Sequence, residues 1–225
     1  MEKIYRIAIL LADRDLPLLY HNQQTLPILF SKFFSRNQCE LTFFNILEHE
    51  YPTNPKDFDV CIITGSKHSV LKREPWAENL YQFILNKKYR KLIGVCYGHQ
   101  MIALALGGKV ERIGWHVGVS TVNYINKNRQ DFQARFNHED QVVTLPDNAT
   151  LLATSPYCKN TLFQIGNNIL SMQFHPEFTQ PYHNKLYSER NIYKLDIAAL
   201  QYAKKTIDLV DDKKKLQALF HDFWQ

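Results

Sequence analysis

The sequence predicts an α/β fold in which a mainly parallel sheet is flanked by helices and extended by an antiparallel segment. Two observations support this fold class. In the first half of the chain, short apolar runs alternate with stretches of helical spacing, as in strand-helix-strand units with right-handed crossovers. After Gly107 and Gly108, the chain changes to short segments of alternating polar and apolar residues, as in antiparallel strands. We expect a single domain over residues 1–225, with the C-terminal helices at 184–225 as part of it.

The parallel part is expected to follow a flavodoxin-like order. Residues 5–12 form a continuous apolar run, as expected for a strand buried on both faces of a sheet. Pro75 favours a helix start, because proline is common in the first helical turn. The other strands are expected at residues 41–47, 58–64 and 92–95, and the helices at residues 17–35, 75–86 and 101–106.

The second half is expected to extend the sheet and then to end in helices. The alternating segments that predict the antiparallel extension are residues 109–113, 117–125, 142–145, 151–154, 161–165 and 169–174. Apolar residues recur at helical spacing over residues 184–210 and again over residues 216–224.

Cys96 lies at the join between a predicted strand and a predicted helix. Gly94 and Gly98 flank it at two residues on either side, so the pattern is that of a nucleophile elbow with cysteine in place of serine. The sharp turn crowds the two flanking positions together, and glycine supplies the room. The helix N-terminus favours an anion at this point. A buried core cysteine is the alternative interpretation, because free cysteines are among the most buried residues.

A second motif, H-P-E at residues 175–177, predicts a histidine beside a carboxylate. Pro176 biases His175 toward an extended backbone, in which residues two apart share a face. His175 and Glu177 are therefore expected on the same side, as the base and its orienting group for a thiol nucleophile. The alternative is a core histidine with satisfied hydrogen bonds and a surface carboxylate.

Composition narrows the class of function. The formal net charge is +5, but Lys and Arg are spread along the chain, so binding to nucleic acid is not expected. The densest basic run, residues 213–215, follows two aspartates and is expected to be the solvated start of a helix. No apolar run is long enough to span a membrane and no targeting signal is recognisable. We therefore expect a cytoplasmic protein with no membrane partner.

The four cysteines, Cys39, Cys61, Cys96 and Cys158, are scattered along the sequence. Their spacing matches neither a zinc site nor a disulfide framework, and it favours a reducing compartment. His99, His116 and His138 also lack the neighbouring cysteines or carboxylates of a metal site, so they are expected to be supporting or surface residues rather than ligands. We expect neither a metal nor a cofactor.

The two motifs together resemble the class I glutamine amidotransferase family. The resemblance rests on G-V-C-Y-G-H-Q at residues 94–100 and Q-F-H-P-E at residues 173–177. T-G-S at 64–66, G-W-x-x-G at 114–118 and N-H-E-D-Q-V at 137–142 agree in order. These features are most similar to the small stand-alone members, which are related to the amidotransferase part of GMP synthase and some of which act on γ-glutamyl peptides.

The resemblance implies a role for each matching residue. Cys96, His175 and Glu177 would form a Cys-His-Glu triad that hydrolyses a γ-glutamyl amide through a thioester. The backbone N–H groups of Gly65 and Tyr97 would form the oxyanion hole. Gln100 would contact the amino-acid end of the substrate.

Three positions depart from the family pattern. Thr64 and Gly65 stand where many members have two glycines, and His116 stands where the stand-alone branch usually has glutamate. The H-G-D pattern is replaced by His138, Glu139 and Asp140. None of the three departures removes a catalytic group, and together they concern the leaving-group side of the expected pocket.

Three functions remain open. The chain could be a glutaminase that passes ammonia to a separate synthase, because 225 residues leave no room for a fused acceptor domain. It could be a γ-glutamyl peptidase that needs no partner. A non-catalytic binding or regulatory module is the third, since a fold alone does not establish function.

Overall fold

The computed structural model describes residues 3–14, 25–35, 38–189 and 195–224. Its strands are β1 (Tyr5–Leu11), β2 (Cys39–Asn45), β3 (Val60–Ile63), β4 (Leu92–Val95), β5 (Lys109–Tyr124), β6 (Phe132–Thr144), β7 (Ala149–Ser155), β8 (Cys158–Ile165) and β9 (Ile169–Met172). The α-helices are α2 (Leu26–Phe34), α3 (Pro75–Asn86), α4 (Tyr97–Ala105), α5 (Gln180–Glu189), α6 (Ile197–Thr206) and α7 (Lys213–Trp224). Short 3-10 turns lie at Ile46–Glu48, Pro55–Asp57 and Val70–Lys72.

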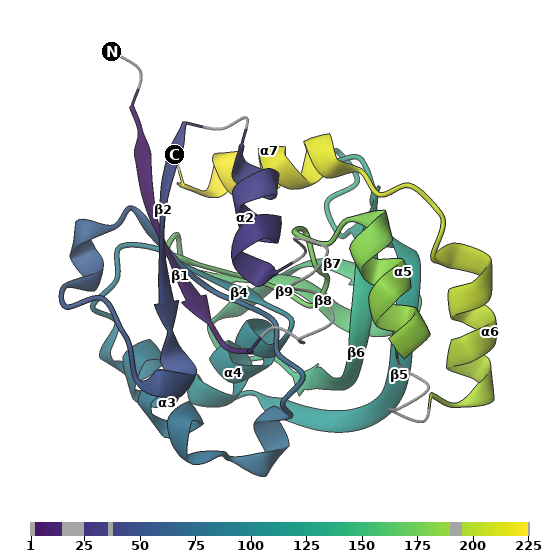
Figure 1. The fold of residues 1–225 in the computed structure, drawn as a ribbon, viewed down its shortest axis with the longest axis horizontal. Helices are drawn as coiled ribbons and strands as arrows, with labels where there is room; N and C mark the ends of the chain where they lie inside the picture. Colours follow the sequence, from purple (N-terminus) through teal and green to yellow (C-terminus); the bar gives the residue numbers. More distant parts are fainter. Residues whose placement is uncertain (1–2, 15–24, 36–37, 190–194, 225) are drawn as a thin grey trace.

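Within the described ranges, the strands form one sheet in the order β2-β1-β3-β4-β9-β8-β7-β5-β6 (Figure 1). The five strands from β2 to β9 are parallel to one another. The four from β8 to β6 continue the sheet in antiparallel pairs. The predicted fold class, a mainly parallel α/β sheet with an antiparallel extension, is confirmed.

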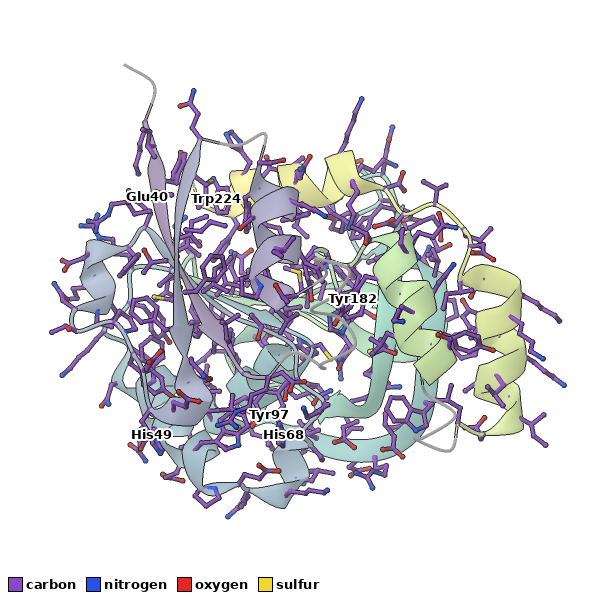
Figure 2. The ribbon with its side chains drawn as sticks, in the orientation of Figure 1. Glu40, His49, His68, Tyr97, Tyr182 and Trp224 are labelled. Carbon is purple, nitrogen blue, oxygen red and sulfur yellow. The ribbon has the colours of Figure 1, made fainter. Side chains whose placement is uncertain are left out.

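Helices cover both faces of the parallel part. Side chains alternate along β1, so that Ile7 and Ile9 pack in one core with the aromatic residues of α2 and α7, while Ala8 and Leu10 pack with α3 and α4 in the other. Figure 1 shows α2 and α7 above the sheet and α3 and α4 below it. In Figure 2, Trp224 lies on the upper side and Tyr97 on the lower side. Burial on both faces explains why β1 is a continuous apolar run.

Several boundaries differ from the prediction. The helix expected at 17–35 begins at Leu26 in the described part, where Thr25 is the N-cap and proline occupies the first turn; residues 17–24 lie outside the described residues. The strand expected at 41–47 ends at Asn45, because the chain then turns into a 3-10 helix. The helix at 75–86 and the strand at 92–95 match the prediction.

The antiparallel part differs more. The two strands expected at 109–113 and 117–125 are one bulged strand, β5. Its partner β6 begins at Phe132, ten residues before the strand expected at 142–145, because polar residues of this strand are buried by tertiary contacts. Assigning residues 169–174 to the antiparallel extension alone was wrong, since β9 also pairs in parallel with β4. All four residues of β9 are buried, as expected for a central strand.

The C-terminal segment contains separate helices. The helix expected to start at residue 184 begins at Gln180 as α5, and α6 and α7 follow. Helix α6 packs on β5 through Val117, Ala203 and Ile207. Helix α7 buries Phe220 and Trp224 against Phe34 of α2. No helix in the described part of the chain is long and apolar enough to cross a membrane.

Candidate active site

Cys96 occupies a strained turn between β4 and α4. It is the N-cap of α4, with φ 50° and ψ −98°, a backbone conformation that non-glycine residues rarely adopt. A Cβ on Gly94 would lie 2.7 Å from the carbonyl oxygen of Gly98, and a Cβ on Gly98 would lie 2.5 Å from the carbonyl oxygen of Ile63. The glycines of the G-x-C-x-G motif are therefore required by the close approach of strand and helix, as predicted.

His175 follows β9, the strand that pairs in parallel with β4. Because carboxyl ends of parallel strands meet at one edge of a sheet, His175 and Cys96 reach the same edge. The Nδ1 atom of His175 lies 2.8 Å from Oε1 of Glu177, and both side chains are buried. The backbone N–H of His175 donates to the carbonyl oxygen of Arg135 at 2.8 Å, which joins this loop to β6.

The charges around His175 favour its imidazolium form. Burial alone lowers the pKa of His175, but the negative charge of Glu177 and the interaction with Cys96 more than offset this effect and raise the pKa to about 10. The Phe178 ring stacks on the imidazole with centroids 3.9 Å apart and planes at 14°. The ring orientation of His175 is thus fixed from two directions, by a carboxylate and by an aromatic face.

Gly65 follows β3 and approaches both of these residues. A Cβ at this position would lie 2.6 Å from Cε1 of His175 and 3.5 Å from Cβ of Cys96. Thr64 takes the first position of the loop, where its hydroxyl accepts from the N–H of Ala12 at 2.9 Å and donates to the carbonyl oxygen of Gly65 at 3.0 Å. Only the second loop position requires glycine, so Thr64 is compatible with the geometry. Tyr97 begins α4, and the first N–H groups of a helix have no intrahelical acceptor.

A cavity of about 490 Å³ opens at this edge, lined by Cys96, His175, Gly65 and Gln100. The Gln100 side-chain NH₂ group donates to the carbonyl oxygen of Asp140 at 2.7 Å and to Oε1 of Gln173 at 3.2 Å. These bonds fix Gln100 at the cavity wall. The cavity volume lies within the range typical of small-molecule binding sites.

The cavity has one charged wall. Asp140 accepts from the Ser69 hydroxyl and from Nε of Arg112, which lies 3.2 Å from Oδ1. Lys67 pairs with Asp13 at 3.1 Å, and its backbone N–H donates to the same carboxylate. Burial raises the pKa of Asp13, although its contacts with Lys67 act in the opposite direction. These contacts hold the loop between β3 and α3 against the loop after β1 and against β6.

Another part of the cavity lining is apolar. Phe178, Tyr182 and Leu186 line the cavity and form a small cluster with Leu26 of α2. Figure 2 shows Tyr182 on the α5 side of the molecule. Trp115 of β5 also lines the cavity. The site therefore offers charged groups to one part of a ligand and apolar side chains to another.

The three histidines expected to be supporting or surface residues have different positions. His116 does not line the cavity; its Nε2 lies 2.9 Å from the Ser120 hydroxyl, and burial lowers its pKa to about 4. His138 lines the cavity and packs at right angles to His116. His99 is buried in the core, with Nδ1 2.9 Å from the Ser171 hydroxyl. Among the described residues, no group of three His, Cys, Asp or Glu side chains could hold a metal ion.

Sequence reasoning missed several residues that support the site. Arg135 has an exposed fraction of only 1%, yet nothing in the sequence distinguishes it from a surface arginine. The expectation that residues 213–215 are a solvated helix start is wrong for Lys213, whose Nζ donates to the carbonyl oxygens of Pro176 and Phe178. Phe178, one residue after the motif, could have been suspected as an aromatic cover for His175.

Comparison with known proteins finds a matching family model and several similar proteins. The family model described as glutamine amidotransferase class-I matches residues 28–195. Gamma-glutamyl peptidase 3 of Arabidopsis thaliana is 28% identical over 199 residues, which are 80% of this chain and 80% of that relative. One subunit of the glutamine-hydrolyzing GMP synthase of Sulfolobus acidocaldarius is 31% identical over 130 residues, which are 54% of this chain and 69% of that relative.

Solved structures show the same fold. A glutamine amidotransferase of Methylobacillus flagellatus matches with a TM-score of 0.75 and 16% identity, over 98% of this chain and 92% of that chain. A glutamine amidotransferase of Thermotoga maritima matches with a TM-score of 0.70 and 20% identity, over 99% of this chain and 97% of that chain. At these identities, the likeness supports the arrangement of the sheet and helices.

Proposed function

Because the chain belongs to the class-I glutamine amidotransferase family, we propose that it hydrolyses a γ-glutamyl amide through a thioester on Cys96. The names of its relatives support amide hydrolysis at the level of the family. One observation supports the proposed Cys-His-Glu mechanism: Nδ1 of His175 lies 2.8 Å from Oε1 of Glu177, at the cavity that His175 and Cys96 both line. A histidine oriented by a carboxylate is the base that a thiol nucleophile requires.

In the first half of the reaction, Cys96 becomes acylated. His175 takes the thiol proton, and Sγ attacks the γ-carbonyl carbon of the substrate to form a C–S bond. The imidazolium then gives its proton to the leaving nitrogen as the C–N bond breaks, which releases ammonia or an amine. Glu177 keeps the imidazole oriented and stabilises its charged form, in agreement with the raised pKa of His175.

In the second half, water hydrolyses the thioester. His175 takes a proton from the water as the new C–O bond forms. The C–S bond then breaks to release glutamate, and His175 returns the proton to Sγ, which regenerates the thiol. The N–H groups of Gly65 and Tyr97 would stabilise the oxyanion in both halves. The close approach of Gly65 to Cys96 and the position of Tyr97 at the start of α4 support this assignment. Each such donor contributes about 3 to 4 kcal/mol in other acyl-transfer enzymes.

We propose that Gln100 contacts the amino-acid end of the substrate. Its NH₂ group is already engaged by Asp140 and Gln173. The amide oxygen of Gln100 is therefore the group available to accept a hydrogen bond from a substrate ammonium group. No step of this reaction requires a metal or a cofactor, because the thiol, the imidazole and water supply every group that the proton transfers use.

Two classes of amide fit this chemistry. Glutamine would make the chain a glutaminase, and its ammonia could pass to a separate synthase, a possibility supported by the similarity to part of a GMP synthase. A γ-glutamyl peptide would make it a peptidase that needs no partner. The apolar wall formed by Phe178, Tyr182 and Leu186 favours the second class, because ammonia gives such a wall nothing to bind.

We propose that residues 1–225 form one domain, with the C-terminal helices included. The burial of Phe220 and Trp224 of α7 against α2 supports this, since α7 then completes one of the two cores that flank the sheet.

Turnover by the purified chain tests the proposed function and separates the two classes. L-glutamine is assayed by ammonia release and a γ-glutamyl dipeptide by release of the free amino acid. Cleavage of the dipeptide supports the peptidase. Cleavage of glutamine alone supports a glutaminase whose rate should rise with its partner, and no cleavage of either substrate contradicts the proposal and favours a non-catalytic module.

A further inference from the structure

Lys213, the first residue of α7, reaches from the C-terminal helix to the loop that carries His175 and Glu177. Its Nζ donates to the carbonyl oxygen of Pro176 and to that of Phe178. These two carbonyl groups belong to the residues immediately before and after Glu177. A single ammonium group therefore holds both ends of the short segment from which the carboxylate projects.

The position of Lys213 is itself fixed by a chain of buried charges. Its Nζ forms an ion pair with Oδ2 of Asp211 at 3.1 Å, and Oδ1 of Asp211 accepts from Nε of Arg135 at 3.1 Å. The Arg135 guanidinium also donates to the carbonyl oxygens of Ile207 and Leu209, at 3.0 and 2.9 Å. Arg135 thus holds the connection between α6 and α7 against β6.

Arg135 also contacts the backbone of His175. The carbonyl oxygen of Arg135 accepts from the backbone N–H of His175 at 2.8 Å. The loop is therefore held at His175 through β6 and at Pro176 and Phe178 through Lys213. Asp211 connects the two attachments, because it binds the side chain of Arg135 on one side and Lys213 on the other.

We propose that Lys213 is a positioning residue for the His175–Glu177 pair. The inference rests on the proposed function, since it assigns the pair a catalytic role. Lys213 does not line the cavity, so it acts through the loop and not on the substrate. Its ammonium sets the distance between Nδ1 and Oε1 and keeps the Phe178 ring on the imidazole.

An ordinary stabilising lysine is the competing explanation, and neighbouring residues allow the two to be separated. Lys214 lies next to Lys213 on the same helix, and its side chain is exposed. Lys214→Met is therefore a matched control that removes the same charge without touching the loop. Lys213→Met removes both hydrogen bonds and the ion pair with Asp211 while keeping an unbranched side chain of similar length.

Steady-state kinetics on whichever substrate the wild type turns over is the first measurement. A displacement of catalytic groups by about 1 Å can cost up to about 100-fold in rate, so we expect Lys213→Met to lower kcat by about 10- to 100-fold while KM changes little. Lys213→Arg keeps donors for both carbonyl groups, and we expect its kcat within about threefold of wild type. Lys214→Met should match the wild type.

Proton NMR gives a readout that does not depend on the substrate. The Nδ1 proton of His175, bonded to Glu177, should give a downfield resonance that is absent in Glu177→Gln. We expect Lys213→Met to shift or broaden this resonance and Lys214→Met to retain it. If the wild type cleaves neither substrate, the proposed function fails, but the resonance still tests the positioning role.

A lowered Tm of Lys213→Met with wild-type kcat and an unchanged resonance would overturn the inference, because Lys213 would then only stabilise the fold. If Lys213→Met does not fold, Lys213→Gln is used instead. Its shorter neutral side chain cannot hold both carbonyl groups, so the same loss of kcat and the same change in the resonance are expected. Wild-type values of both in the folded Lys213→Gln protein would equally overturn the inference.

Discussion

The Nδ1 atom of His175 lies 2.8 Å from Oε1 of Glu177, and the two side chains are buried together at the carboxyl edge of the parallel strands. Cys96 reaches the same cavity from the neighbouring strand. The chemistry proposed for the chain depends on this pair, because the carboxylate sets both the orientation and the charge of the imidazole.

Replacing Glu177 with glutamine should lower kcat/KM by up to about 10⁴-fold, because an amide neither orients nor charges the imidazole as a carboxylate does. Glu177 raises the pKa of His175, so the imidazolium is present below that pKa and lost as the pH rises through it. In Glu177→Gln this pKa falls, and the alkaline limb of the pH–rate profile should move to lower pH.

The pH dependence of kcat/KM measures this shift. Glu78→Gln is a suitable control, because Glu78 is exposed on α3, far along the sequence from the His175 loop. Among the described residues, the hydrogen bond found for its side chain is the one from Gln82. An alkaline limb that stays in place in Glu177→Gln would show that the carboxylate does not control His175.

Gly65→Ala should reduce activity by about 100-fold with little loss of folding, because the added Cβ would lie 2.6 Å from Cε1 of His175 and must displace the ring. Gly166→Ala is the matched control. It lies in the turn between β8 and β9, where an added Cβ would lie 3.5 Å from Oδ1 of Asn168. Its φ of 53° strains an alanine backbone, so this variant should show a lower Tm and wild-type activity. Equal activity of the two variants, measured beside their Tm values, would argue against a close approach of Gly65 to the base.

The Arg135–Asp211 pair should matter for stability. Arg135→Met leaves the buried Asp211 carboxylate with Lys213 as its remaining ion-pair partner and removes the donors to the carbonyl oxygens of Ile207 and Leu209, and we expect the free energy of unfolding to fall by about 3 kcal/mol. Urea denaturation measures this change.

An exposed ion pair on the same chain provides the contrast. Arg129 lies 3.8 Å from Asp222 and both side chains are well exposed, so Arg129→Met should cost less than about 1 kcal/mol. Similar losses in the two variants would mean that burial does not set the strength of the Arg135 contact.

Much of the fold and the core of the candidate site follow from local sequence signals. Apolar runs mark the parallel strands, and the glycines around Cys96 mark the sharp turn because sterics leave no alternative there. Pro176 makes the backbone of His175 extended, which brings Glu177 to the same side. Each of these signals involves residues that are close in the sequence.

The missed features depend on residues that are far apart in the sequence. The sequence of β6 does not predict a buried strand, because Arg135 and Asn137 are residue types that usually lie at the surface. Their burial depends on partners that are distant in the sequence, such as Asp211 for Arg135. Lys213 looks like a solvated lysine, since no local pattern indicates that Pro176 and Phe178 accept from it across more than thirty residues. Buried polar groups are specified by tertiary contacts, and periodicity carries no information about them.

Direct detection of the acylated enzyme tests the central claim, that Cys96 forms a covalent intermediate. The wild type and Cys96→Ala are mixed with a γ-glutamyl dipeptide, quenched in acid and digested, and the peptide that contains residue 96 is analysed by mass spectrometry; Cys158→Ala serves as the cysteine control. We predict a mass gain of one γ-glutamyl group on Cys96 in the wild type and the control, and neither adduct nor turnover in Cys96→Ala. Undiminished turnover by Cys96→Ala would contradict the account.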